Sequence, residues 1–109
     1  MKILLDENID VRFRHVFDAQ KFEVYTVRYM GWNGLKNGEL LRKMEEESFD
    51  VFIAVDKNLP YEQNLENLPV AVVILDVKKN LLPRLQGIAP KLFDLLSKGF
   101  TPSVHILKA

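Results

Sequence analysis

Residues 51–56, VFIAVD, decide the fold class of this 109-residue chain. Five consecutive apolar residues followed by an aspartate are typical of a strand that is covered on both faces. Residues 69–75, PVAVVIL, have the same character and end just before Asp76. Strands that are buried on both sides occur in parallel sheets with helices on either face, so the two runs predict an α/β protein.

The segments on either side of these runs alternate between strand and helix patterns. Strands are expected at residues 2–5, 22–27, 51–55, 69–75 and 103–107, and helices at 9–20, 39–48 and 80–98. We expect Asn8 to cap the first helix, and Pro90 to kink or split the last one before Gly99 ends it. Because helical crossovers make neighbouring strands parallel, we predict a three-layer α/β/α sandwich around a parallel five-stranded sheet. The length of the chain predicts a single domain, 1–109.

Composition restricts the classes of function. Fifteen basic and fifteen acidic residues cancel, so the chain has no overall attraction to nucleic acid, and any such contact needs a local basic patch or metal ions. There is no cysteine, which excludes disulfides, thiolate zinc sites and cysteine nucleophiles. No apolar run approaches the roughly 20 residues that a membrane span needs, so we expect a cytoplasmic protein without a membrane partner.

Acidic residues stand where the predicted strands end. Asp6 and Glu7 follow the first strand, Asp56 follows the third and Asp76 follows the fourth. Glu39 opens the second helix, which can approach the same edge if the loop before it folds back. Because the carboxyl ends of parallel strands meet at one edge of a sheet, and ligands bind there, these carboxylates are expected to converge.

Converging carboxylates predict a bound cation. Carboxylates repel one another unless positive charge lies among them, and hard oxygen ligands suit Mg²⁺ or Mn²⁺. Such an ion can polarise a phosphodiester and generate hydroxide from bound water. An acid at a helix start can instead serve only as a cap or as a partner for the helix dipole, so each position keeps a purely structural alternative.

Several cationic and aromatic residues are candidates for contacts with nucleic acid. Trp32 lies in a glycine-rich loop and could stack on a base. The candidates for phosphate contacts, if they gather near the acidic edge, are Arg12, Arg28, Lys36 and Lys57.

Three runs of the chain resemble a known family. The runs are LLDENI at 4–9, VRYMGWNGLKNGELL at 27–41 and VDKNLPYEQNL at 55–65. In their order and spacing they resemble the small bacterial PIN-like proteins, relatives of VapC-type toxin nucleases, and the resemblance extends through the leucine-rich helix after LDVKKN at 75–80.

The resemblance implies a three-layer fold and an Mg²⁺- or Mn²⁺-dependent ribonuclease, with RNA as substrate and a cognate antitoxin protein as partner. It carries the catalytic, metal-binding positions onto Asp6, Glu39 and Asp56, with Asn8 and Asn58 in support. Asn58 stands where many PIN-like proteins have a further aspartate, which lowers the charge available to hold a metal ion. A homodimer is a further candidate assembly.

Two other readings stay open. One is a PIN-like interaction module that has lost activity, which the asparagine at position 58 and the zero net charge favour. The other is a receiver-like phosphoacceptor domain, because receivers also have an acidic pair after strand one, an aspartate after strand three and a lysine after the last strand, here Lys108. Asp76 argues against the receiver, since receivers have serine or threonine at that position.

Overall fold

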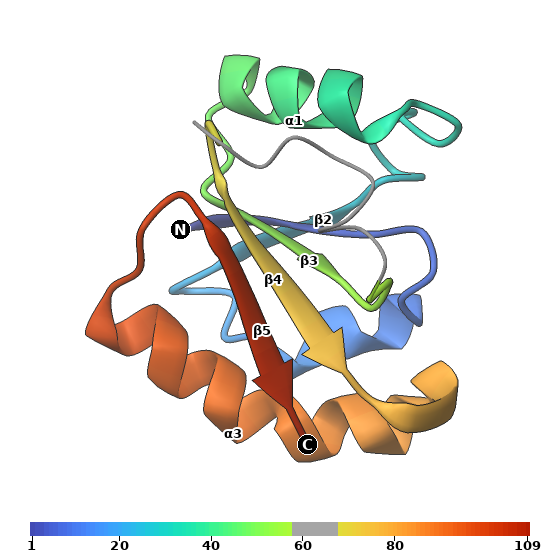
Figure 1. Ribbon diagram of the computed structural model, residues 1–109, viewed down its shortest axis with the longest axis vertical. Coiled ribbons are helices and arrows are strands. Elements are labelled where there is room, and N and C mark those ends of the chain that lie inside the picture. Colours follow the sequence, from blue (N-terminus) through green and yellow to red (C-terminus); the bar gives the residue numbers. More distant parts are fainter. Residues whose placement is uncertain (58–67) are drawn as a thin grey trace.

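The computed structural model describes residues 1–57 and 68–109. These residues form a five-stranded sheet in which all neighbouring strands are parallel, in the order β2-β1-β3-β4-β5 (Figure 1). The strands are β1 (Lys2–Leu5), β2 (Glu23–Thr26), β3 (Val51–Ala54), β4 (Ala71–Asp76) and β5 (Val104–Lys108). The predicted α/β fold with a parallel sheet is confirmed. The limits of β1 are as expected, and those of the other four strands differ from the expected ones by at most two residues.

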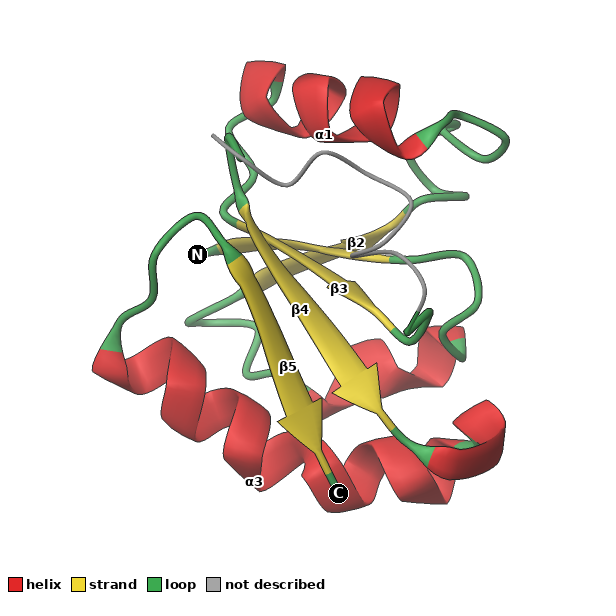
Figure 2. Ribbon diagram, viewed as in Figure 1, coloured by secondary structure: helices red, strands yellow, loops and turns green. Residues whose placement is uncertain are grey.

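Helices cover both faces of the sheet. Helix α1 (Asn37–Glu46) lies over one face, and the 3-10 helix η1 (Val11–Val16) and helix α3 (Leu82–Lys98) lie over the other (Figures 1 and 2). A further 3-10 turn, η2 (Lys78–Asn80), joins β4 to α3. None of the helices in the described part of the chain combines the length and the apolar character that a membrane span needs.

The strands supply two separate cores because their side chains alternate between the faces. In β1, Ile3 and Leu5 join the cluster beneath η1 and α3, whereas Leu4 joins the cluster beneath α1. In β3, Ile53 belongs to the first cluster and Phe52 to the second. All four residues of β3 are buried, which is why its sequence reads as an uninterrupted apolar run.

The helix expected at residues 9–20 is instead the short 3-10 helix η1, and its cap is Asp10 rather than Asn8. The Asp10 carboxylate accepts a hydrogen bond from the main-chain N–H of Arg12 at 3.0 Å. The helix does not continue because Asp18 opens a turn: its carboxylate accepts from the N–H of Gln20 at 2.9 Å. Aspartate side chains compete in this way with helical hydrogen bonds, so apolar spacing alone overestimates the helix.

Helix α3 is not split at Pro90. The proline is exposed on the outer side, while one face of the helix buries Leu85, Ile88, Ala89, Leu92 and Leu96 against the sheet. Packing of that face offsets the cost of the missing N–H donor. The helix ends at Gly99, as predicted, where the backbone φ is +89°.

Candidate functional site

The carboxyl edge of the sheet carries a charged residue at or shortly after the end of every strand. Across the sheet they are Arg28 after β2, Asp6 after β1, Asp56 after β3, Asp76 at the end of β4 and Lys108 at the end of β5. The parallel sheet therefore places the three predicted strand-end aspartates side by side along one edge. Arg28 stands at one end of this row of aspartates and Lys108 at the other.

The strand order makes the β1/β3 boundary the switch point of this fold. From β1 the chain crosses outward to β2 and then returns to β3 on the other side of β1. In doubly wound sheets with the order 2-1-3-4-5, ligands bind outside the carboxyl ends of the strands at this boundary. Asp6 and Asp56 stand on its two sides.

Asp6 is held in place by hydrogen bonds. Its main-chain N–H donates to the carbonyl oxygen of Ile53 at 2.9 Å, and its own carbonyl oxygen accepts from the N–H of Ile9 at 3.0 Å. Its carboxylate Oδ1 accepts from the N–H of Glu7 at 2.9 Å. The side chain is half-buried, so the carboxylate has a defined position at the edge of the sheet.

The pKa of the Asp6 carboxyl is raised above its ordinary value. Burial is the largest cause, and the negative charges of Glu7 and Asp56 add to it, against the opposing hydrogen bond from the Glu7 N–H. The influence of Asp56 means that the two carboxylates are near enough to repel. A cation between them would relieve that repulsion.

Glu39 does not join this pair. It is exposed in the first turn of α1. Among residues 1–57 and 68–109 there is no group of three or more Asp, Glu, His or Cys side chains that could hold a metal ion. Asp6, Glu39 and Asp56 therefore do not form a three-carboxylate cluster here, and only Asp6 and Asp56 are brought together.

A pocket of about 280 Å³ opens beside Asp6. Asp6, Glu7 and Asn8 line one part of it, and Thr26 and Arg28, from the end of β2 and the loop after it, line another. Arg28 and Asp6 thus line the same pocket. A phosphate group that entered it would meet the cation of Arg28 next to the carboxylates at the switch point.

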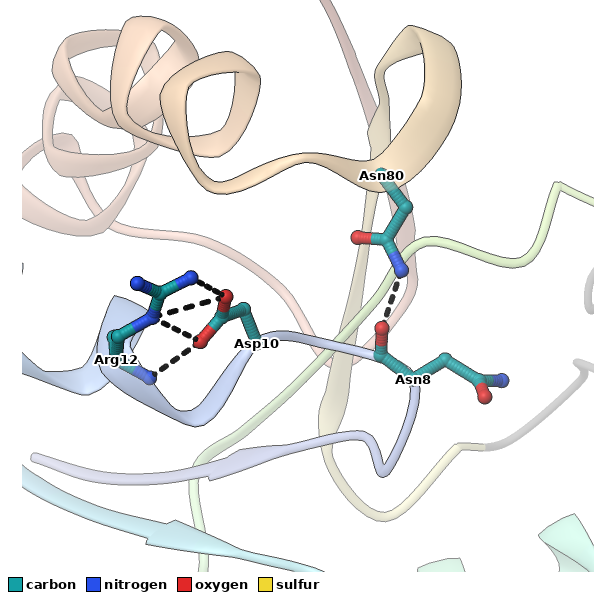
Figure 3. Close-up of polar contacts among 4 residues, drawn as sticks. All are labelled: Asn8, Asp10, Arg12 and Asn80. Carbon is teal, nitrogen blue, oxygen red and sulfur yellow. Dashed lines mark hydrogen bonds and ion pairs between the residues drawn. The ribbon is translucent and has the colours of Figure 1, made fainter.

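Three of the other residues predicted to contact nucleic acid are engaged in contacts within the protein. Arg12 is engaged with Asp10, with its Nη2 at 2.6 Å from Oδ2 (Figure 3). Lys57 is paired with Asp76, Nζ to Oδ1 at 2.6 Å. Trp32 is half-buried and packs edge-on against Phe49, with ring centroids 5.7 Å apart, which is a core contact.

The remaining residues that were predicted for the site are Lys36, Asn8 and Asn58. Lys36 is exposed at the N-cap of α1. Asn8 is exposed, and its side chain points away from Asn80 and Arg12 (Figure 3). Asn58 lies outside the described residues.

Asn80 makes a hydrogen bond near the candidate site that the sequence did not predict. Its side-chain Nδ2 donates a hydrogen bond to the main-chain oxygen of Asn8, which joins the segment after β4 to the segment after β1 (Figure 3). The bond spans the intervening strand β3. Asn80 has a φ of +41°, a conformation that asparagine adopts more readily than most residues. A lone asparagine after KK carries no periodic signal that could have predicted this role.

Comparisons of the chain with models of protein families, with curated proteins and with solved structures give no match.

Proposed function

We propose that this protein is a metal-dependent endoribonuclease of PIN-like type. The observation that carries the proposal is the Asp6–Asp56 carboxylate pair at the β1/β3 switch point, where burial and mutual repulsion raise the pKa of Asp6. Carboxylates arranged in this way are stabilised by a cation. The finer fold assignment, a three-layer PIN-like sandwich, belongs to the same proposal.

Two carboxylates suit the ion that we propose. Mg²⁺ is usually held by one or two carboxylates, keeps several water molecules and takes its remaining ligands from substrate phosphates. Asp6 and Asp56 would hold Mg²⁺ or Mn²⁺, and the bound ion supplies an activated water and stabilises the charge that develops on the phosphate. The PIN-like resemblance also assigns Glu39 to this ion, with Asn8 and Asn58 in support. Glu39 and Asn8 are exposed, Glu39 does not join the Asp6–Asp56 pair, and Asn58 lies outside the described residues, so the proposal rests on Asp6 and Asp56.

Arg28 would position the substrate. It lines the pocket that Asp6 also lines, and the structure gives its side chain no ion-pair partner among the described residues. A guanidinium binds phosphate oxygens in a fixed geometry, so Arg28 would hold the scissile phosphate against the carboxylate pair.

The test is cleavage of a labelled single-stranded RNA in Mg²⁺, in Mn²⁺ and in EDTA. We expect Asp6→Asn and Asp56→Asn each to lower the rate by about a hundredfold or more, because the charge that stabilises the transition state is lost. Asp94→Asn, on the exposed side of α3, is the matched control and should cleave like the wild type. Circular dichroism would establish that all three variants fold. Full activity in Asp6→Asn would refute the assignment.

The proposal extends to partners and location. The PIN-like resemblance adds an RNA substrate and a cognate antitoxin protein to the proposal. The cytoplasmic location is proposed from the composition, and a homodimer is kept as a candidate assembly. Purifying the chain together with the product of the adjacent reading frame tests the antitoxin: a complex that suppresses cleavage is expected.

A non-catalytic interaction module is the second candidate. It is favoured by the lack of a three-acid group in the described residues and by the engagement of Asp76 with Lys57. Calorimetric titration of the protein with Mn²⁺ separates the two functions. Binding that Asp6→Asn abolishes supports the nuclease, and no heat at millimolar Mn²⁺ supports the module.

A receiver-like phosphoacceptor is the third candidate, and the strand order 2-1-3-4-5 favours it because that doubly wound order is the one that receivers use. In this reading Asp56 would accept a phosphoryl group. Against it, Asp76 is ion-paired with Lys57 at the position where a receiver has a hydroxyl side chain. Incubation with acetyl phosphate followed by mass measurement decides: a phosphoryl group on Asp56 would replace the nuclease proposal.

A further inference from the structure

A second pocket lies at the carboxyl ends of β4 and β5, and its charge is opposite to that of the Asp6–Asp56 pair. Its volume is about 310 Å³. The charged side chains that line it are Lys57, Asp76, Lys78, Arg84 and Lys108. We call this group the basic pocket.

Asp76, the one acidic side chain among the described residues of the basic pocket, is already paired with a cation. Asp76 Oδ1 lies 2.6 Å from Lys57 Nζ. Lys78, Arg84 and Lys108 are exposed, and within the described residues their side chains have neither a hydrogen-bond partner nor an ion-pair partner. Among the described residues that line the pocket there are four cations and one acidic side chain, which is paired with Lys57.

The cations come from separate segments that the fold brings together. Lys57 follows β3, Lys78 belongs to η2, and Lys108 ends β5, where it pairs in register with Asp76. Arg84 lies in the first turn of α3, a helix of 17 residues whose amino end adds partial positive charge. Like charges gathered without counter-ions repel, so an anion would stabilise this arrangement.

The basic pocket adjoins the carboxylate pair along the same edge. Asp56 and Lys57 are consecutive residues, and β3, β4 and β5 are neighbours in the sheet. Neighbouring strands lie about 4.8 Å apart, so the distance from β3 to β5 is roughly 10 Å. An extended polyanion that lies along the edge would therefore pass from the switch point into the basic pocket.

We propose that the basic pocket binds backbone phosphates of single-stranded RNA, next to the phosphate at the Asp6–Asp56 pair. The pocket itself selects phosphate, and the identification of the polymer as RNA rests on the proposed function. The cations are spread over four segments and are exposed to solvent, which suits the successive phosphates of a chain better than one enclosed ion. Binding of this kind has little dependence on base sequence and falls steeply with salt.

The experiment measures binding without cleavage. A fluorescein-labelled single-stranded oligoribonucleotide is titrated with the protein in EDTA, and the anisotropy is followed at several salt concentrations. We expect the double variant Arg84→Gln, Lys108→Gln to bind roughly tenfold more weakly, and the slope of log K against log salt to fall by about 0.7 for each phosphate contact that is lost. Arg42→Gln, an exposed arginine on α1, is the matched control and should bind like the wild type.

Two further arms make the result decisive. Thermal melting shows whether each variant folds. If the double variant does not fold, Lys78→Gln removes a different positive charge of the same pocket and takes its place. Titration with inorganic phosphate tests the other source of the same chemistry. Wild-type binding and an unchanged salt slope in folded variants would overturn the proposal. Tight binding of free phosphate that RNA does not displace would overturn it as well.

Failure of this inference is distinguishable from failure of the nuclease assignment. Loss of RNA binding in the double variant, together with unchanged cleavage in Asp6→Asn, would support the basic pocket and refute the nuclease. If cleavage depends on Asp6, and the double variant changes neither cleavage nor RNA binding, the nuclease is supported and the basic pocket is refuted.

Discussion

The side-chain amide of Asn80 donates a hydrogen bond to the main-chain oxygen of Asn8, and so connects the segments that follow β4 and β1. Asn8 is two residues beyond Asp6. The position of the loop that carries the candidate site therefore depends on a residue that is 72 positions away in the chain.

Replacing Asn80 separates its hydrogen bond from its backbone conformation. We expect Asn80→Gly to lower the free energy of unfolding by about 1 kcal/mol, because the Asn8 oxygen loses its donor. Asn80→Ala should lower it by about 2 kcal/mol, because alanine also resists a positive φ. The Asn80 Oδ1 atom is buried and accepts no hydrogen bond within the described residues, so its removal offsets part of the loss. Urea denaturation in EDTA measures both, and equal stabilities for wild type and Asn80→Ala would contradict the role of this contact.

Asp6→Asn should stabilise the metal-free protein at neutral pH. Because the pKa of Asp6 is raised in the folded state, ionised Asp6 disfavours folding at pH values above that pKa. As the pH falls through the folded pKa towards the ordinary value of 3.8, the wild type takes up a proton and the penalty disappears. The melting temperature of Asp6→Asn in EDTA should therefore exceed that of the wild type at pH 7, with a difference that shrinks towards pH 4. A lower melting temperature for Asp6→Asn than for the wild type at pH 7 would show that the ionised carboxylate does not destabilise the folded protein.

Asp10 should behave in the opposite way. Its hydrogen bonds from the side chain and the main-chain N–H of Arg12 lower the pKa of Asp10 to about 2. Its contribution to stability is therefore present above pH 3.8 and is lost as the pH falls through about 2. Asp10→Asn keeps the cap but removes the charge, so its melting temperature should be slightly lower than that of the wild type at pH 7. Because the pair is exposed, 0.5 M salt should reduce this difference, and a deficit that persists unchanged at pH 2 would contradict the explanation.

Two glycines of the last helix region should respond to alanine with opposite signs. Gly87 lies inside α3, and a Cβ atom there would meet nothing within 4 Å. We expect Gly87→Ala to raise the free energy of unfolding by about 1 kcal/mol, because the unfolded chain loses conformational freedom. Gly99→Ala should lower the free energy of unfolding by about 1 to 2 kcal/mol, because φ is +89° there. Urea denaturation of both variants is the measurement, and the same sign for both would contradict the assignment of α3 and its end.

Local patterns predicted the sheet well but the helices less well. The buried strands β3 and β4 were legible because both of their faces meet helices, so almost every residue is apolar. The first helix was misjudged because Asp10 and Asp18 bind the backbone at its two ends and restrict it to η1. Pro90 was overrated as a helix breaker, because the buried face of α3 holds the helix together on the other side.

The candidate site was predicted in part for a similar reason. That Asp6, Asp56 and Asp76 stand at one edge follows from a parallel sheet alone, since each comes at or shortly after the end of a strand. Glu39 was a weaker inference, because its position depends on the path of the loop at 27–36, which no periodic pattern describes. Lys78, Arg84 and Lys108 were not singled out as phosphate contacts, because nothing in their local sequence links them.

Local sequence patterns were enough to predict the parallel α/β architecture and the residues that end its strands, because hydrophobic periodicity and turn chemistry act between near neighbours in the chain. Which of those residues meet could be read only from the folded chain. The strand order β2-β1-β3-β4-β5 places Asp6 beside Asp56 and joins Asp76 to Lys57. It also gathers Lys78, Arg84 and Lys108 near the carboxyl ends of β4 and β5. Charges act on one another through space over a few ångströms, and the distances between strand ends are fixed by packing across the whole sheet.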